Sequence, residues 1–266
     1  SRFNGWMRSV AIAVIAVFVP NQVSWAFNYN PSVLYGTSVP NVETSMMVLP
    51  AERAAMLVSG SVGHLLAEVE NKPASRIDLK VDDGVSRGSW FTPAKEFTLK
   101  IDSQVQFTRP QVEEIRAWLG DPSIHHLNCG VYALNDILAA KGIQKPPEEV
   151  SVMTVTVDLM GGIVKPGDRT LKTSLYAMAR VAETFNLEYT AAKFKPESIV
   201  KLNLPFIAHL SDEHFVTVTA IEGDRVRIMD LGQPAVMPRT EFIEKATGFV
   251  LAPGLYFFFQ ADFEKV

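Results

Sequence analysis

The spacing of apolar residues changes along the chain, from a helical repeat in the middle to a strand repeat near the end. Between residues 51 and 185, apolar side chains recur every three or four positions, which indicates amphipathic helices. After residue 204 they recur at every second position, which is typical of half-buried strands. The first pattern predicts helices over residues 51–70, 110–119, 129–140 and 171–185, and the second predicts strands over residues 204–210, 214–221, 225–230 and 255–259.

Turn and capping residues agree with these elements. Pro110 suits the first turn of a helix, and Gly120 and Gly142 follow the ends of two predicted helices. The sequence Glu222-Gly223-Asp224 is a tight turn that joins two of the strands as an antiparallel hairpin. Helices that precede antiparallel strands in this way predict an α+β fold.

The most apolar segment lies near the N-terminus. Arg8 precedes an apolar run over residues 10–19, and Pro20 ends it. This length is short for a bilayer span but suits the apolar core of a secretory signal. Ser24 and Ala26 supply small residues where a signal peptidase cleaves, so cleavage is expected after Ala26. We therefore expect an exported protein, periplasmic, secreted or anchored to the membrane by this segment; the alternative is a buried or interfacial helix.

We divide the chain into three parts on these patterns. Residues 1–26 are the signal peptide or N-terminal anchor. Residues 27–108 form a smaller N-terminal α+β region without evident chemistry, in which residues 77–81 and 96–101 alternate as strands do. Residues 109–262 contain the remaining helices and strands and form the domain with the candidate functional residues.

Composition narrows the class of protein. The chain has 266 residues, of which 47% are hydrophobic and 20% are charged, as in globular proteins. Its formal net charge of −4 gives no basic surface for nucleic acid, so nucleic-acid binding is not expected. Cys129 is the single cysteine and cannot form an internal disulfide, so it is either a small buried side chain or a reactive thiol.

The surroundings of Cys129 favour a reactive thiol. A thiolate forms more readily at the N-terminus of a helix, where Cys129 is predicted to lie, and Gly130 lets a substrate backbone approach closely. His214 begins one strand of the predicted hairpin and Asp230 ends the other, so the two side chains are expected to be adjacent. Asp230 would then orient the imidazole of His214 while the imidazole polarises the thiol.

These segments resemble the peptidase C39 family of bacterial, bacteriocin-processing cysteine peptidases. The resemblance lies in Asn128-Cys129-Gly130-Val131-Tyr132-Ala133-Leu134, in residues 207–210, in His214-Phe215-Val216-Thr217-Val218 and in residues 226–230. Residues 167–171 and 186–188 are similar to the connection between these parts, and the likeness extends over residues 110–260. The resemblance implies a papain-like fold and cleavage of peptides. It assigns Cys129 as nucleophile, His214 as general base and acid, and Asp230 as the residue that orients His214.

Two positions depart from the family pattern. Ser123 occupies the place of the family's glutamine that helps to bind the oxyanion, and Asn128 replaces the acidic residue before the cysteine. Loss of an oxyanion donor lowers the rate of acyl transfer by about a hundred- to a thousandfold. Ser123, His125, His126 and Asn128 are the candidate substitutes, beside the backbone N–H of Cys129.

Other interpretations of the same residues remain open at this stage. His125, His126 and Cys129, with His209 and His214, have side chains that bind transition metals, but their spacing matches no established metal motif, and neither a metal nor a cofactor is expected. His209 follows Ala208 on an apolar strand and is expected to support the site or fill the core.

The sequence thus predicts a peptidase that acts on a peptide or protein substrate. The alternatives are a C39-like domain that is weak or inactive as a catalyst and binds a peptide or partner protein, and acyl transfer to an amine. The chain lacks the phosphate-binding motif of an ATP-binding cassette and is expected to be a separate relative of the peptidase domains of exporters.

Overall fold

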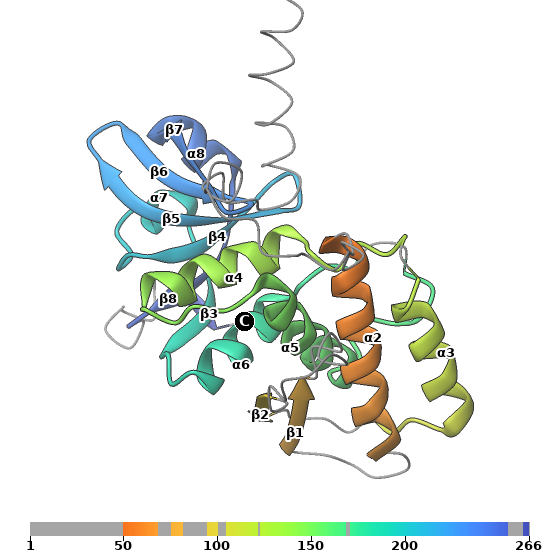
Figure 1. Ribbon diagram of the computed structural model, residues 1–266. Helices are drawn as coiled ribbons and strands as arrows, with labels where there is room; N and C mark the ends of the chain where they lie inside the picture. Colours follow the sequence, from red (N-terminus) through yellow and green to blue (C-terminus); the bar gives the residue numbers. More distant parts are fainter. Residues whose placement is uncertain are drawn as a thin grey trace, which may run out of the picture. The chain divides into compact units, whose positions relative to one another are not determined.

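The computed structural model describes residues 50–68, 76–81, 95–100, 105–121, 123–168, 171–254 and 263–265 (Figure 1). The predicted signal segment, residues 27–49 and the predicted strand over residues 255–259 lie outside the described residues. The helices are α2 (Pro50–Glu68), α3 (Arg109–Leu119), α4 (Cys129–Ala140), α5 (Pro147–Met160), α6 (Leu175–Thr184), α7 (Pro196–Ile199) and α8 (Arg239–Lys245). The strands are β1 (Arg76–Val81), β2 (Lys95–Lys100), β3 (Tyr189–Phe194), β4 (Phe206–Leu210), β5 (His214–Glu222), β6 (Arg225–Asp230), β7 (Gln233–Pro238), β8 (Ala246–Pro253) and β9 (Phe263–Lys265).

A seven-stranded antiparallel sheet, in the order β7-β6-β5-β4-β8-β3-β9, is covered on both faces (Figure 1). Successive side chains of a strand point to opposite faces. Ile207 accordingly belongs to the core that includes α4, α5 and α6, whereas Ala208 belongs to a second core with Ile199 of α7 and Phe242 of α8. The predicted α+β fold, with helices packed on an antiparallel sheet, is confirmed.

Polar residues at the helix starts explain where the helices begin. The side-chain oxygen of Gln111 accepts a hydrogen bond from the Thr108 backbone N–H at 2.8 Å at the start of α3. Ser174 caps α6 by accepting a hydrogen bond from the Ala177 N–H at 2.9 Å. Helix α6 therefore begins at Leu175, and the predicted helix over residues 171–185 was placed four residues too early.

Helix α5 was not predicted because its sequence has no polar face. Its residues from Glu149 to Met160 are all buried. Its threonine hydroxyls are satisfied within the helix, since Thr154 and Thr156 donate to the carbonyls of Val150 and Val152, and the Ser151 hydroxyl donates to the His126 carbonyl. A helix buried on all sides has no amphipathic repeat to reveal it.

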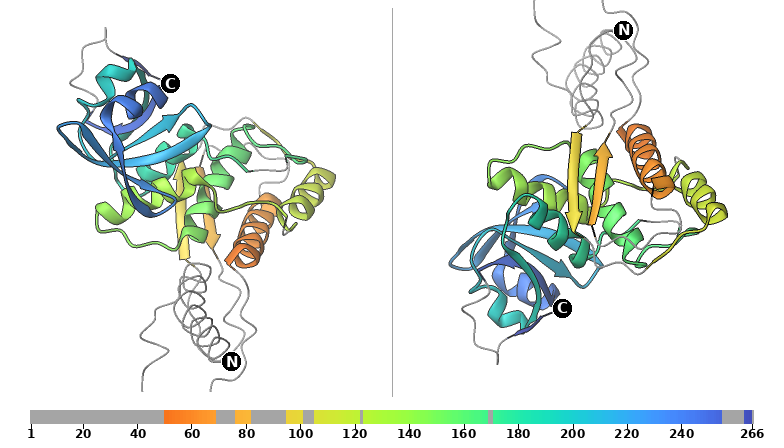
Figure 2. Two further views of the ribbon diagram at one scale, coloured as in Figure 1. Left: turned by 90° about the horizontal axis from the view of Figure 1, so that it is seen from above. Right: turned by 90° about the horizontal axis from the view of Figure 1, so that it is seen from below.

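The N-terminal elements belong to the same hydrophobic core as α4, α5 and α6. The strands β1 and β2 form an antiparallel pair, which Figure 2 shows side by side. Helix α2 packs beside α3, where the Arg116 guanidinium donates to the Gly63 carbonyl at 3.0 Å. Leu66 of α2 and Leu79 of β1 are fully buried in the core that contains Val131. The boundary between residues 108 and 109 stays a prediction.

The outer strand β7 contains two prolines, Pro234 and Pro238, whose nitrogens lie on the same side of the strand. Pro234 lies opposite Met229 and Pro238 lies opposite Arg225 in the register with β6. The Arg239 N–H donates to the Asp224 carbonyl at 2.7 Å. In an antiparallel pair every second residue forms such bonds, so the residues of β7 that are hydrogen-bonded to β6 alternate with the prolines. The nitrogens of Pro234, Val236 and Pro238 thus face away from β6, and only Val236 carries an N–H there.

Candidate active site

Cys129 is the first residue of α4 and is half-buried. The side chain of the preceding residue, Asn128, caps this helix. Its Oδ1 accepts hydrogen bonds from the backbone N–H groups of Gly130 at 3.1 Å and Val131 at 3.2 Å. The cap fixes the start of the helix, and the helix N-terminus favours negative charge on the thiol.

The segment over residues 171–174 holds Asn128 from the other side. The Thr173 hydroxyl donates to Asn128 Oδ1 at 2.9 Å, and Asn128 Nδ2 donates to the Leu171 carbonyl at 3.0 Å. A Cβ added to Gly130 would lie 2.7 Å from Thr173 Cβ, closer than side chains approach. The space beside Gly130, where the sequence predicted the approach of a substrate backbone, is therefore filled by Thr173, and this packing requires glycine at position 130.

His214 and Asp230 are brought together as the hairpin predicts. The Nε2 of His214 lies 2.7 Å from Asp230 Oδ1, with side chains that are 24% and 43% exposed, respectively. An ionised carboxylate only accepts hydrogen bonds, so Nε2 carries the proton when the imidazole is neutral, and Nδ1 is left with a lone pair. This is the tautomer that a general base requires.

The start of α4 lies at the end of the sheet that carries His214 and Asp230. The Thr217 hydroxyl on β5 donates to the Ala133 carbonyl at 2.9 Å, one helical turn after Cys129. A Cβ added to Gly232, two residues beyond Asp230, would lie 3.6 Å from the Tyr132 ring. These two contacts place the first turns of α4 beside the strands that carry His214 and Asp230.

The four candidate oxyanion donors differ in availability. Asn128 is committed to the helix cap and to Leu171. His126 is 2% exposed, and burial lowers its pKa to about 4, so its imidazole is neutral. Ser123 is exposed in a turn where its N–H donates to the Asp121 carboxylate at 2.8 Å, and His125 is exposed. Their predicted oxyanion role stays a prediction.

His209 lies beside the predicted base. It pairs across strands with Phe215, the neighbour of His214, and its ring lies 4.8 Å from the Phe215 ring. Its Nδ1 lies 2.9 Å from the Thr247 hydroxyl, which itself donates to the His209 carbonyl. Nδ1 must therefore be the donor, and burial lowers the pKa of His209. His209 is a neutral, hydrogen-bonded neighbour of the site.

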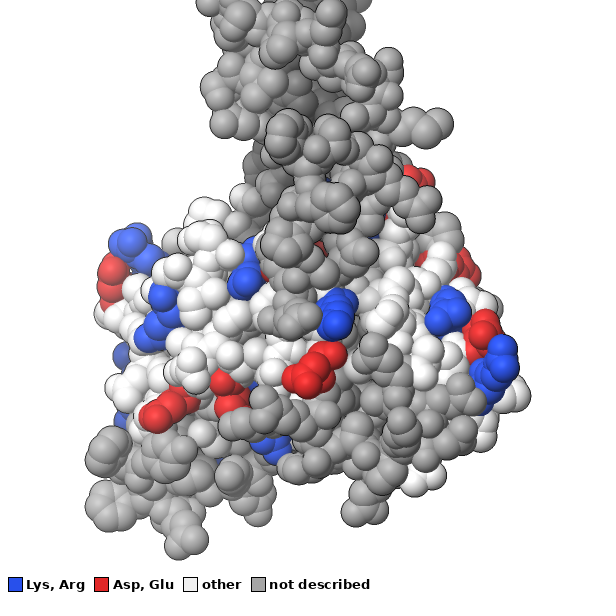
Figure 3. Space-filling view, turned by 60° about the horizontal axis from the view of Figure 1, so that its bottom comes forward, with Lys and Arg blue, Asp and Glu red and all other residues white. Residues whose placement is uncertain are grey.

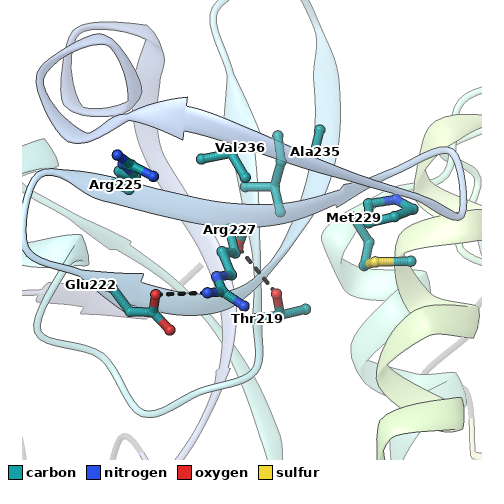
Figure 4. Close-up of a pocket in the computed structure, with 9 residues that line it drawn as sticks. Thr219, Glu222, Arg225, Arg227, Met229, Ala235 and Val236 are labelled. Atoms are coloured by element: carbon teal, nitrogen blue, oxygen red, sulfur yellow. Dashed lines mark hydrogen bonds and ion pairs between the residues drawn. The ribbon is translucent and has the colours of Figure 1, made fainter.

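Two further features lie apart from these residues. A groove of about 410 Å³ on β5, β6 and β7 is lined by residues that include Arg225, Met229 and Val236 (Figure 4). None of the predicted catalytic residues lines it. Within the part of the chain that the structure describes, no three His, Cys, Asp or Glu side chains are grouped as metal ligands.

The comparisons with known proteins bear on the sheet and on His214 and Asp230. Residues 167–254 match the peptidase C39 family. The resemblance inferred from the sequence is confirmed for this range, which contains both His214 and Asp230. The C39 match begins after Cys129, so the assignment of Cys129 as nucleophile stays a prediction. No curated protein sequence matches the chain.

Solved structures with C39 peptidase domains are similar over about half of the chain. A double glycine motif protease from an AMS/PCAT transporter, in complex with a leader peptide, is 23% identical, with 48% of this chain and 86% of that one covered and a TM-score of 0.40. The peptidase C39 like domain of a toxin secretion ATP-binding protein from Vibrio parahaemolyticus is 20% identical (47% and 96% covered, TM-score 0.37). The peptidase domain of Streptococcus ComA, a bi-functional ABC transporter, is 18% identical (48% and 93% covered, TM-score 0.39).

Proposed function

We propose that this chain is an extracytoplasmic cysteine peptidase that hydrolyses a peptide bond with Cys129, His214 and Asp230. The C39 match supports a cysteine peptidase-like domain. The observation that carries the proposal is the hydrogen bond from His214 to Asp230 at the end of the sheet where α4 begins with Cys129. It supports the role of Asp230 as the residue that orients His214, and we assign the second ring nitrogen of His214 to the thiol.

The reaction follows from this arrangement. Nδ1 of His214 takes the proton of the Cys129 thiol, and the thiolate attacks the peptide carbonyl carbon to form a tetrahedral oxyanion. The intermediate collapses, the C–N bond breaks, and the imidazolium returns the proton to the leaving amine. Water, deprotonated by His214, then attacks the thioester and releases the acid and the thiol. Asp230 stays ionised and holds the ring throughout.

The lone cysteine makes the proposal testable without a known substrate. We expect iodoacetamide to label Cys129 in the folded chain faster at pH 6 than it labels the chain unfolded in urea, because the helix N-terminus and His214 favour the thiolate. His214→Ala should slow the labelling about tenfold or more, whereas His64→Ala, at an exposed position on α2, should leave it unchanged. Labelling of the folded chain at the rate of the unfolded chain contradicts the nucleophile assignment.

A second candidate function is a C39-like domain that binds a peptide without cleaving it. It is favoured by the state of the oxyanion donors, because Asn128 is engaged as a cap and His126 is buried. A peptide library incubated with the wild-type chain separates the two functions by mass spectrometry. Cleaved products that disappear in Cys129→Ala support the peptidase, and retention of uncleaved peptides by both forms supports the binding domain.

The extracytoplasmic location rests on the N-terminal sequence. Among the described residues, no helix has both the length and the apolar character to cross a bilayer. Expression of the chain followed by fractionation and N-terminal sequencing tests the location. A mature protein that begins at Phe27 outside the cytoplasm supports export, and a full-length chain in the cytoplasm contradicts it.

A further inference from the structure

The short segment over residues 171–174 contacts three parts of the molecule through successive side chains. It lies between α5 and α6 outside any helix or strand, whereas the sequence predicted a helix from residue 171 and likened only residues 167–171 to a connection. Leu171 and Thr173 are buried, whereas Lys172 is exposed. Its contacts therefore alternate between the interior and the surface, as in a strand.

The interior contacts reach the nucleophile. Thr173 is 5% exposed, and its hydroxyl donates to Asn128 Oδ1, the atom that also accepts from the Gly130 and Val131 N–H groups. The Leu171 carbonyl accepts from Asn128 Nδ2. Both ends of the Asn128 amide are thus held by this segment, and the amide in turn fixes the first turn of α4.

The segment is anchored by a buried carboxylate. Asp158 on α5 is 1% exposed, and it accepts hydrogen bonds from the Ser174 N–H at 3.0 Å and the Ser174 hydroxyl at 2.5 Å. Ser174 also caps α6. The position of Thr173 is therefore set by two helices that do not themselves carry a predicted catalytic residue.

The surface contact reaches the predicted base. Lys172 forms an ion pair with Glu213, the residue immediately before His214. Glu213 has a left-handed backbone with φ of 59°, which forms the turn from β4 into β5. Thr173 thus bonds Asn128, the residue before Cys129, and Lys172 bonds Glu213, the residue before His214.

We propose that residues 171–174 are a positioning brace that fixes the position of Cys129 relative to His214. The brace rests on the proposed function, because it acts on the same two residues. Thr173 acts through Asn128, and Lys172 acts through Glu213, so neither is expected to touch the substrate. Both are positioning residues.

The Thr173 contact is tested with the full chain by the pH profile of Cys129 alkylation with iodoacetamide. Thr173→Val keeps the shape of the side chain but removes the donor to Asn128. We expect alkylation at pH 7 to slow about two- to fivefold, the effect of a weakened helix N-terminus on a charge. Thr173→Ser, which keeps the hydroxyl, should restore the rate. Thr219→Val is the matched control. The Thr219 hydroxyl, on β5, donates to the Arg227 carbonyl on β6 and makes no bond to Asn128.

Amide exchange gives a second measurement that does not depend on reactivity. Hydrogen exchange of the Gly130 and Val131 N–H groups should become at least about twofold faster in Thr173→Val and stay unchanged in Thr219→Val. If the wild-type thiol reacts no faster than in the unfolded chain, the proposed function fails while this exchange still tests the brace. Unchanged exchange and an unchanged pH profile in Thr173→Val overturn the brace.

The Lys172 contact is tested by the same alkylation. Lys172→Met should slow alkylation at pH 7 by about two- to threefold, because the imidazolium stabilises the thiolate only when the turn holds it in place. Lys172→Arg keeps the ion pair and should restore the rate. Lys201→Met, at another exposed lysine, is the control for loss of one positive charge. Equal rates in Lys172→Met and Lys201→Met remove Lys172 from the brace.

Discussion

Asn128 shows how one residue is matched to its neighbours. Its amide presents an acceptor to Gly130, Val131 and Thr173 and a donor to the Leu171 carbonyl. The acidic residue that the family resemblance expects at this position has no such donor. A carboxylate would place a second oxygen against the Leu171 carbonyl oxygen and a negative charge beside the thiol. The amide avoids both, so the departure from the family pattern suits the local hydrogen bonds.

The substitution Asn128→Asp tests this match. We expect iodoacetamide to alkylate Cys129 more slowly at pH 7, because a like charge disfavours the thiolate. We also expect a loss of about 1–2 kcal/mol in the free energy of unfolding from the repulsion at Leu171, measured by urea denaturation. Gln144→Glu, at an exposed position after the end of the same helix, is the control for the added charge. An unchanged alkylation rate would show that the amide of Asn128 has no special role.

Only part of the candidate site could be predicted from the sequence. The identity and order of Cys129, His214 and Asp230 predict the helix start and the adjacent strand ends, because a hairpin fixes which residues meet. The partners of Asn128 were missed, since Leu171 and Thr173 lie 43 and 45 positions away and no local pattern links them to it. A serine before an apolar repeat does signal a helix start at Ser174, and this signal would have placed residues 171–174 outside the helix.

At the scale of elements, the helices and strands that were predicted correctly have one polar face, whereas α7, α8, β3 and β8 were not predicted. Helix α4 and strand β6 were predicted with the bounds that the structure has, and β5 differs by one residue. Helix α5 was missed because it is buried all round. Strand β7 was missed for the opposite reason, since it is exposed except for the partly buried Met237 and contains two prolines. Periodicity detects a contrast between two faces, and neither element has one.

The junction of α5 with α6 makes stability depend on pH. Burial raises the pKa of Asp158 to about 6, against the hydrogen bonds from Ser174 that lower it. The folded state then holds the proton more tightly than the unfolded state, so the contribution of Asp158 to stability is fully present below about pH 4 and is lost as the pH rises through about 6. The loss at Asp158 amounts to as much as about 3 kcal/mol.

Asp158→Asn removes this ionisation. Urea denaturation at a series of pH values should show the variant gaining up to about 3 kcal/mol on the wild type between pH 4 and pH 7.5. The gain is expected within this window only, because Asp158 is fully ionised in both states above it. Asp212→Asn, at an exposed site, should follow the wild-type profile. Parallel profiles for Asp158→Asn and the wild type would contradict the raised pKa.

At the scale of the molecule, the face shown in Figure 3 carries no large group of charges of one sign. On the face shown in Figure 3, the basic and acidic side chains of the described residues are interspersed. The sheet carries the two hydrophobic cores on its opposite faces, and α2 and the β1–β2 pair add to one of them. This sharing was not predicted, because the sequence shows that a segment has an apolar face but not which surface covers it.

The outer edge of β7 is expected to limit self-association. Pro234→Thr adds a backbone N–H on the side away from β6 and favours strand geometry. We expect the variant to form dimers or larger species at concentrations where the wild type does not, as measured by size-exclusion chromatography with light scattering. Pro196→Thr, at the start of α7, is the control for loss of a proline. A variant as monodisperse as the wild type would show that the edge is protected in another way.

The peptide substrate that we propose would be an extended chain, and extended chains are the material from which cross-β fibres grow. An open strand that offered donors at every second position would let such chains add to the sheet and seed a fibre. With proline at positions 234 and 238, the outer edge of β7 presents a single N–H, at Val236, so an incoming chain would find one hydrogen-bond donor where an unblocked strand offers three. Pro234 and Pro238 thereby make this edge of the sheet a poor surface for the addition of a further strand.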